Sequence, residues 1–87
     1  MKYKICVTNK DIDRGAPKSV WQCPIAIALK RKFAKFTPSV SEVEFSLWFK
    51  GDQEFYSLPR KAEKFIQDFD NGKKVKPFSF CVNLKED

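Results

Sequence analysis

The end of the chain carries the clearest pattern of apolar and polar positions. In residues 57–84, apolar side chains first recur at the spacing of one helix face and then alternate with polar ones, as in a half-buried strand. The helical stripe is Ala62, Phe65, Ile66 and Phe69, and the strand stripe is Phe78, Phe80, Val82 and Leu84. Asp70-Asn71-Gly72 is typical of a helix end. Because both elements need a shared core, the pattern predicts a folded α+β domain.

The earlier segments add five predicted elements. Alternation of Tyr3, Ile5 and Val7 predicts a short first strand, and Asn9 opens a single helical turn. A helix is expected to start at Pro24 and to end at Thr37-Pro38. The period then changes to two. Val43, Phe45, Leu47 and Phe49 are expected on one side of a strand, which a turn over residues 50–53 connects to a strand over residues 54–58 before Pro59 opens the last helix.

The order of the main elements is strand, helix, strand, strand, helix, strand. It predicts a single α+β domain over residues 1–87: a βαββαβ two-layer sandwich, ferredoxin-like, with a four-stranded, mainly antiparallel sheet and both helices on one face. The open sheet face is expected to carry Lys2, Lys4, Cys6, Trp48, Tyr56, Cys81 and two glutamates. Other α+β topologies with the same elements remain open, because the connection before the first long helix is long.

Composition excludes several classes of protein. An 87-residue chain forms one small domain with little room for an internal active site. It has no histidine, which removes the usual Ser/His and Cys/His nucleophiles, and its three cysteines lack metal-type spacing and are expected to be free thiols. No apolar run is long enough for a membrane span or a secretory signal, so a cytoplasmic location is the default expectation. We expect no catalytic residues, no metal and no cofactor.

The charge is unevenly distributed along the chain. The formal net charge is +6, but residues 1–38 hold nine basic side chains against Asp11 and Asp13, a net +7, whereas residues 39–87 have a net charge of −1. Lysine clusters of this kind favour an acidic partner, either an acidic protein or a nucleoprotein surface. The competing interpretation is a solvated helix end and a solvated loop, since cations at a helix C-terminus also stabilise the helix dipole.

The partner-binding residues expected from these clusters are cationic, with one exposed aromatic beside them. They are Lys30, Arg31, Lys32, Lys35, Trp48, Lys73, Lys74 and Lys76. Trp48 lies on the polar side of its predicted strand, where an exposed indole is a natural interface anchor. Coverage of that indole by Trp21 and the 10–20 segment is equally consistent with the sequence.

Direct binding of nucleic acid is the alternative. Lysines beside aromatic residues are found in nucleic-acid-binding proteins. However, the strand motifs of the RNA-recognition version of the ferredoxin-like fold are not matched. Cys6 stands where a stacking ring is expected, and Asp52 and Glu54 stand where bases would stack.

Cys23 precedes Pro24 at a predicted helix start, a position that lowers the pKa of a thiol. Without a histidine base, a small buried residue is a better interpretation than a catalytic nucleophile. Cys6 and Cys81 become cross-strand neighbours if the first and last strands pair.

Four motifs, in order, carry a family resemblance. They are Ile12-Asp13-Arg14-Gly15, Cys23-Pro24-Ile25-Ala26-Ile27-Ala28-Leu29, Phe69-Asp70-Asn71-Gly72 and Val75-Lys76-Pro77-Phe78-Ser79-Phe80. With these motifs the chain resembles a group of small uncharacterised proteins encoded by bacteriophages and prophages. The resemblance implies a phage origin and carries over no site residues. Small phage proteins frequently inhibit or modulate host machinery, so it also implies a host-takeover or anti-defence inhibitor that acts by binding.

Overall fold

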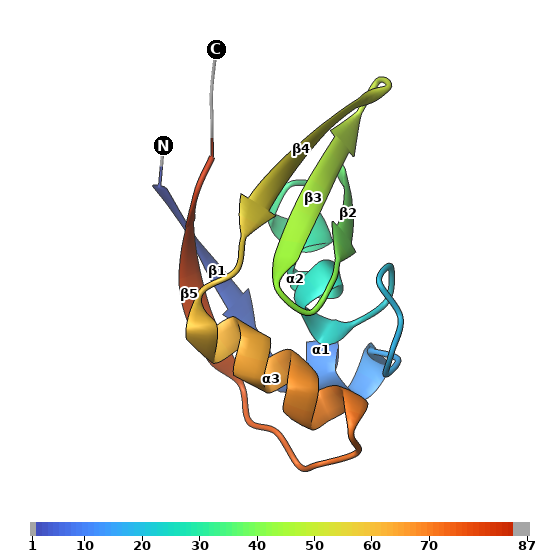
Figure 1. Cartoon of the computed structure of the whole chain (residues 1–87), viewed down its shortest axis with the longest axis vertical. Helices are drawn as coiled ribbons and strands as arrows, with labels where there is room; N and C mark the ends of the chain where they lie inside the picture. The colour runs from blue at the N-terminus through green and yellow to red at the C-terminus, as the bar shows by residue number, and fades with distance from the viewer. Residues whose placement is uncertain (1, 85–87) are drawn as a thin grey trace.

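Two separate antiparallel sheets make up the β-structure of residues 2–84, the part of the chain that the computed structural model describes (Figure 1). The β1–β5 ribbon pairs β1 (Lys2–Val7) with β5 (Phe78–Asn83). The second sheet places β3 (Glu44–Phe49) between β2 (Thr37–Val40) and β4 (Asp52–Ser57). The helices are α1 (Asn9–Arg14), α2 (Pro24–Lys32) and α3 (Arg60–Asp70).

The α+β class is therefore confirmed, whereas the ferredoxin-like arrangement with one four-stranded sheet is wrong. Residues 37–40, expected to follow a helix end, instead form β2 and pair with β3. The predicted third strand is β4, and within residues 2–84 it pairs with β3 but not with β1, so no strand joins the two sheets. Within residues 2–84, β1 accordingly pairs only with β5.

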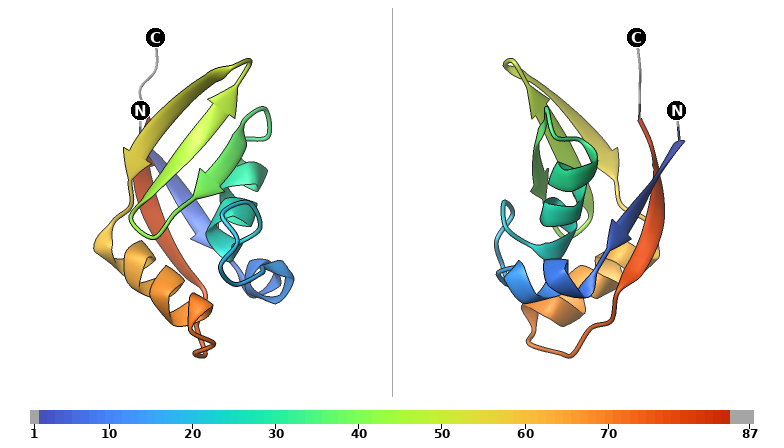
Figure 2. Two further views of the ribbon diagram at one scale, coloured as in Figure 1. Left: turned by 45° about the vertical axis from the view of Figure 1, so that its right-hand side comes forward. Right: turned by 180° about the vertical axis from the view of Figure 1, so that it is seen from behind.

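Helix α2 lies between the two sheets instead of covering one sheet beside the other long helix. In the view from behind, it lies in front of the three-stranded sheet with the ribbon to one side, and α3 crosses the lower end (Figure 2). Its contacts reach both β1 and β2. Five of its nine residues are buried: Pro24, Ile25, Ala26, Ala28 and Leu29. A helix covered from two sides is apolar around most of its circumference, which matches this stretch.

Helix α2 also ends earlier than expected, at Lys32 and not at Thr37-Pro38. Phe33 leaves the helical conformation and is buried in the core. The Lys30 ammonium then donates hydrogen bonds to the carbonyl oxygens of Ala34 (2.8 Å) and Phe36 (2.9 Å). These bonds hold the chain in the tight turn that leads from the helix into β2.

The predicted alternation of β1 and β5 and the apolar stripe of α3 are confirmed. Ile5 and Val7, Phe80 and Val82, and Ala62, Phe65 and Ile66 all belong to one buried cluster, which also contains Ile25, Leu29, Phe45 and Leu47. Phe69 and Phe78 pack partly buried against it.

Two positions in and beside the three-stranded sheet differ from the prediction. Val43 is 59% exposed, because β3 begins only at Glu44. Tyr56, expected on the open face, packs against the core and stacks on Phe45, with ring centroids 5.2 Å apart. The hairpin turn explains the second error. Only Lys50 and Gly51 form it, so Asp52 and Gln53 already belong to β4.

The single helical turn expected from Asn9 is confirmed as α1, but its N-cap is Thr8. The Thr8 hydroxyl accepts from the Asp11 N–H, and the Asp11 carboxylate accepts from the Thr8 N–H, so the two form a capping box. Asp11 is only 2% exposed and also pairs with Arg31 of α2 at 2.6 and 2.8 Å. Arg31 donates further to the carbonyl oxygen of Cys6 at 2.8 Å. This cluster joins β1, α1 and α2.

The pKa of Asp11 is a balance of opposing effects. Burial alone raises it, but the hydrogen bonds from Arg31 and Thr8 and the charge of Arg31 together lower it below its ordinary value. The carboxylate therefore stabilises the fold above its unfolded-state pKa, and this contribution is lost as the pH falls through the lower folded-state pKa.

We expect Asp11→Asn to lower the free energy of unfolding at neutral pH by about 2 kcal/mol, because charge-assisted hydrogen bonds contribute about 1.5–3 kcal/mol. The difference between wild type and variant should shrink as the pH falls below about 4. Urea unfolding at several pH values measures both effects. Asp13→Asn, an exposed change on the same helix, is the control and should leave stability unchanged. Equal effects of the two substitutions would contradict the role given to Asp11.

Candidate functional site

The cations expected to bind a partner fall into two groups that the fold keeps apart. Lys30, Arg31, Lys32 and Lys35 lie at and after the C-terminal end of α2. Lys73, Lys74 and Lys76 lie in the loop between α3 and β5, at the bottom of Figure 1, in a molecule 39 Å long. Lys73 lies 3.9 Å from the Asp68 carboxylate, while Lys74 and Lys76 are exposed. The eight predicted residues thus do not make one continuous face.

Within the α2 group, the residues differ in how they are held. Lys30 and Arg31 are fixed by the hydrogen bonds that end α2 and join it to α1. Lys35 lies over the rings of Phe36 and Phe49, 5.4 and 5.5 Å from their centroids, and Lys50 lies 5.3 Å from the Phe49 ring centroid. Lys32 is exposed. Several of these cations therefore make interactions that stabilise the fold.

A groove of about 460 Å³ runs beside α2 and brings an exposed indole next to cations. We call it the Trp21 groove. It is lined by Arg14, Trp21, Ala26, Ile27, Lys30, Arg31, Thr37 and Pro38, from the end of α1, the loop before α2, the outer side of α2 and the start of β2. Trp21 is 55% exposed. The lining contains three cationic side chains and no carboxylate.

The charge of the Trp21 groove comes mainly from two of its three cations. Arg31 is offset by the buried carboxylate of Asp11, which raises the pKa of the guanidinium further above its ordinary value. The Lys30 ammonium donates to two carbonyl oxygens, so one of its three donors remains for another acceptor. Arg14 is exposed and forms no ion pair within residues 2–84. The groove therefore favours anionic groups beside an aromatic contact.

The outer sheet face is the side of the β2–β3–β4 sheet that points away from α2. It exposes Trp48 (38%), in agreement with the interpretation of Trp48 as an exposed indole, and it also exposes Phe55 (58%). The register places Phe55 opposite Ser46 and Trp48 opposite Gln53, so the two aromatic residues are diagonal neighbours on one face. Ser46 is buried between them, and its hydroxyl is within hydrogen-bonding distance of Ser39 (2.6 Å) and accepts from Gln53 (2.9 Å).

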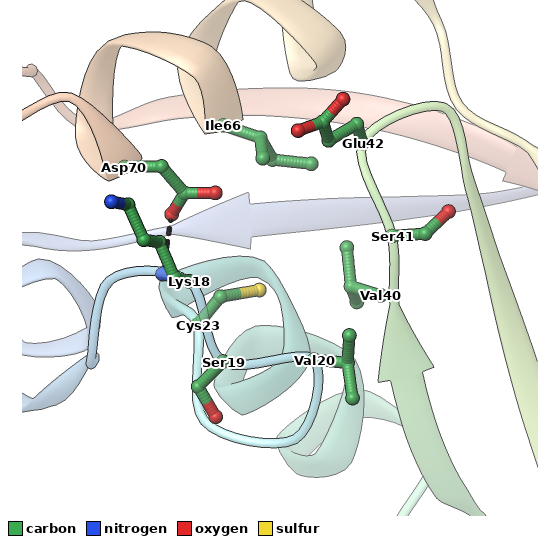
Figure 3. A pocket seen from close by; sticks show the side chains of 9 residues that line it. All are labelled: Lys18, Ser19, Val20, Cys23, Val40, Ser41, Glu42, Ile66 and Asp70. Atoms are coloured by element: carbon green, nitrogen blue, oxygen red, sulfur yellow. Dashed lines mark hydrogen bonds between the residues drawn. The ribbon is translucent and has the colours of Figure 1, made fainter.

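A third candidate is a cavity of about 260 Å³ between the loop before α2, the end of β2 and α3 (Figure 3). It is lined by Lys18, Ser19, Val20, Cys23, Val40, Ser41, Glu42, Ile66 and Asp70. The Lys18 N–H donates to the Asp70 carboxylate at 2.8 Å, which closes the loop against the end of α3. The Lys18 side chain points away from the cavity, whereas the Cys23 sulfur points toward it.

Cys23 is buried, as expected, but the expected lowering of its pKa is wrong. Burial raises the pKa of the thiol and outweighs the lowering by the hydrogen bond that its sulfur accepts from the Ala26 N–H. The thiol is thus neutral and caps α2. Cys6 and Cys81 are exposed on one face of the ribbon, but Cys6 faces Ser79 and Cys81 faces Lys4, so they are diagonal to each other. Residues 2–84 contain no cluster of three or more metal-ligating side chains.

Sequence reasoning missed Trp21 as a site residue and Phe55 altogether. A signal for Phe55 was present. A two-residue Lys50-Gly51 turn pairs residue 49 with 52, which places Phe55 opposite Ser46 and on the same face as Trp48. Trp21 belongs to no periodic stripe, and its exposure depends on how the 15–23 loop passes α2. The alternative interpretation, in which Trp21 covers Trp48, does not hold, because Trp21 lines the groove beside α2 and Trp48 is exposed.

Known proteins add no family assignment to these surfaces. No protein-family model, curated protein or solved structure matches this chain. None of the helices in residues 2–84 has the length and apolar character needed to cross a bilayer. The function is accordingly inferred from the residues of the chain and their geometry.

We expect two of the three thiols to react rapidly with Ellman's reagent in the native protein. Cys6 and Cys81 are exposed, whereas Cys23 is buried and neutral. Because Cys23 requires local opening, its reaction should be slower on the order of 100-fold. Cys23→Ala should leave the rapid phase at two thiols, and Cys6→Ala should reduce it to one. A rapid phase of three thiols, or one that loses a thiol in Cys23→Ala, would show that Cys23 is accessible.

Proposed function

We propose that this chain is a small, non-enzymatic binding protein that docks an acidic surface of another protein through the Trp21 groove. The observation that carries this proposal is the position of a half-exposed indole in a groove lined by Arg14, Lys30 and Arg31 and by no carboxylate. Tryptophan and arginine are the residue types most enriched among interface hot spots.

Preorganisation supports the same proposal. Lys30 and Arg31 are already held in place by hydrogen bonds within the protein, so binding does not have to immobilise them. Ala26, Ile27 and Pro38 provide an apolar floor beside the indole. A partner that places a carboxylate near Arg14 and Lys30 and an apolar group against Trp21 would match both the charge and the apolar surface of the groove.

The non-enzymatic part of the proposal is supported by the chemistry of the site residues. The chain has no histidine, and the buried thiol of Cys23 is neutral and serves as a helix cap. The Asp11 carboxylate is committed to Arg31 and Thr8. These groups do not form a nucleophile with an adjacent base.

The resemblance to phage-encoded proteins indicates which kind of partner the chain would bind under this proposal. The partner would be a bacterial host protein or nucleoprotein, and the chain would act as a host-takeover or anti-defence inhibitor. Direct binding of nucleic acid is the alternative. It is less favoured, because residues 37–57 carry Glu42, Glu44, Asp52 and Glu54 against Lys50 and would repel phosphates on that side.

We expect Trp21→Ala and Arg14→Glu each to weaken capture of the partner from host lysate by at least about tenfold, the size typical of a hot-spot substitution. Both residues are exposed, so the fold should be retained, and urea unfolding checks this. Quantitative mass spectrometry of the captured proteins, with and without nuclease treatment, measures the effect.

The matched control is Lys74→Glu, which makes the same kind of charge change in the α3–β5 loop. It should leave capture unchanged. The proposal is wrong if Lys74→Glu reduces capture as much as Arg14→Glu, or if Trp21→Ala captures the same proteins in the same amounts. Loss of all capture after nuclease treatment would favour the nucleic-acid alternative.

A further inference from the structure

The outer edge of β4 is open to a further strand. β4 is the last strand of its sheet, and no strand of residues 2–84 pairs with its other side. It is six residues long, pairs with β3 without a bulge, and contains neither lysine nor proline. Sheet edges in natural proteins are usually blocked by charged side chains, above all lysine, by proline or by bulges, and of these β4 carries only the carboxylates of Asp52 and Glu54.

The register shows which backbone groups of β4 point to this edge. Lys50 and Gly51 both have positive φ (51° and 85°), so the hairpin has a two-residue turn, and the pair that flanks such a turn is hydrogen-bonded. Along the β3–β4 ladder, hydrogen-bonded pairs then alternate with non-hydrogen-bonded pairs. The hydrogen bond from the Leu58 N–H to the Val43 carbonyl oxygen at 3.0 Å lies at a position where this alternation requires a hydrogen-bonded pair. The N–H and C=O groups of Gln53, Phe55 and Ser57 therefore point away from β3.

The opposite edge of the same sheet is closed. On β2, the Val40 N–H donates to the Val20 carbonyl oxygen at 2.8 Å, so the loop before α2 covers that edge. Pro38 in the same strand has no N–H to offer. Of the two edges of the three-stranded sheet, that of β4 is therefore the one where a strand can be added.

Side chains along β4 determine which strand fits. Asp52 and Glu54 are both exposed and lie on one face, whereas Phe55 lies on the other face beside Trp48. Glu44 on the neighbouring strand pairs with Ser57 and therefore lies on the face of Phe55, not beside these two carboxylates. An added strand would place alternate side chains beside the two carboxylates and the remaining ones beside the exposed rings.

We propose that the β4 edge binds, by strand addition, an extended segment of another protein in which lysine or arginine alternates with apolar residues. Basic side chains pair with Asp52 and Glu54, and apolar side chains pack against Phe55 on the outer sheet face. This site is separate from the Trp21 groove and takes a partner of the opposite charge.

A second copy of the chain is a poor occupant of this edge. In an antiparallel pair of two β4 edges, the residues that point to the edge face each other, so even-numbered residues of both copies share one face. Asp52 and Glu54 of the two copies would then gather on that face and repel one another. Two copies of this edge would therefore not pair with each other, whereas the edge remains complementary in charge to a basic strand.

A synthetic ten-residue peptide of alternating lysine and valine, acetylated and amidated at its ends, tests the proposal by NMR titration. The backbone amides of Gln53, Phe55 and Ser57 should shift and become protected from hydrogen exchange. N-methylation of every peptide residue should abolish binding, because it removes the donors from both edges of the added strand. A peptide of alternating glutamate and valine should bind at least about tenfold more weakly.

Protein variants separate charge from fold. Glu54→Lys should weaken binding of the lysine–valine peptide by about fivefold, whereas Glu42→Lys, the same charge change at an exposed position outside β4, should change it less than about twofold. Trp21→Ala should have no effect, so failure here and failure of the proposed function are distinguishable. Equal binding of the N-methylated peptide, amide shifts confined to other elements, or a β4-paired dimer of the protein alone would each overturn the proposal.

Discussion

Burial of α2 between two separate sheets is the constraint on which the rest of the structure depends. The helix is only nine residues long, and more than half of them are buried. Its side chains Ile25 and Leu29 share one cluster with Ile5 of the ribbon and Phe45 of the three-stranded sheet. In a domain of this size, few other side chains are available to join two layers, so removing this contact would leave each sheet with an uncovered apolar face.

The cluster around Asp11 makes the position of α2 specific. Apolar packing alone would tolerate small rotations of a short helix, but Arg31 must reach both the Asp11 carboxylate and the Cys6 carbonyl oxygen. A buried carboxylate without its guanidinium would be costly, which penalises other orientations. The same contact has a consequence for function. It fixes Arg31 in the wall of the Trp21 groove, so a residue that stabilises the fold also shapes the candidate binding surface.

The distribution of charge reinforces the division between the two candidate surfaces. Residues 37–57, which form the three-stranded sheet, have a net charge of −3 in a chain whose overall charge is +6. The basic groove lies beside α2 and α1, whereas the acidic edge lies on β4. We infer that the two surfaces are adapted to partners of opposite charge, and that long-range attraction would orient each partner before contact.

Local patterns in the sequence determined the elements and their buried sides wherever the period was regular. The stripes of β1, α3 and β5 and the stop at Asn71-Gly72 required only side-chain spacing and a residue suited to positive φ. The unequal distribution of charge and the lack of a histidine were equally visible. Among the site residues, Lys30 and Arg31 were correctly placed at a helix end, and an exposed Trp48 was one of two consistent interpretations.

Only the tertiary structure decided which strands pair and which surface residues come together. Whether residues 37–40 merely follow a helix end or join β3 depends on a free sheet edge and on Phe33 entering the core, and neither can be read from four residues. The face occupied by Phe55 followed from a hairpin register, and the meeting of Trp21 with Arg14 followed from the path of a nonperiodic loop. Strand pairing and loop path depend on contacts between distant residues, whereas helical and strand periods depend on near neighbours, and a single sequence displays only the latter directly.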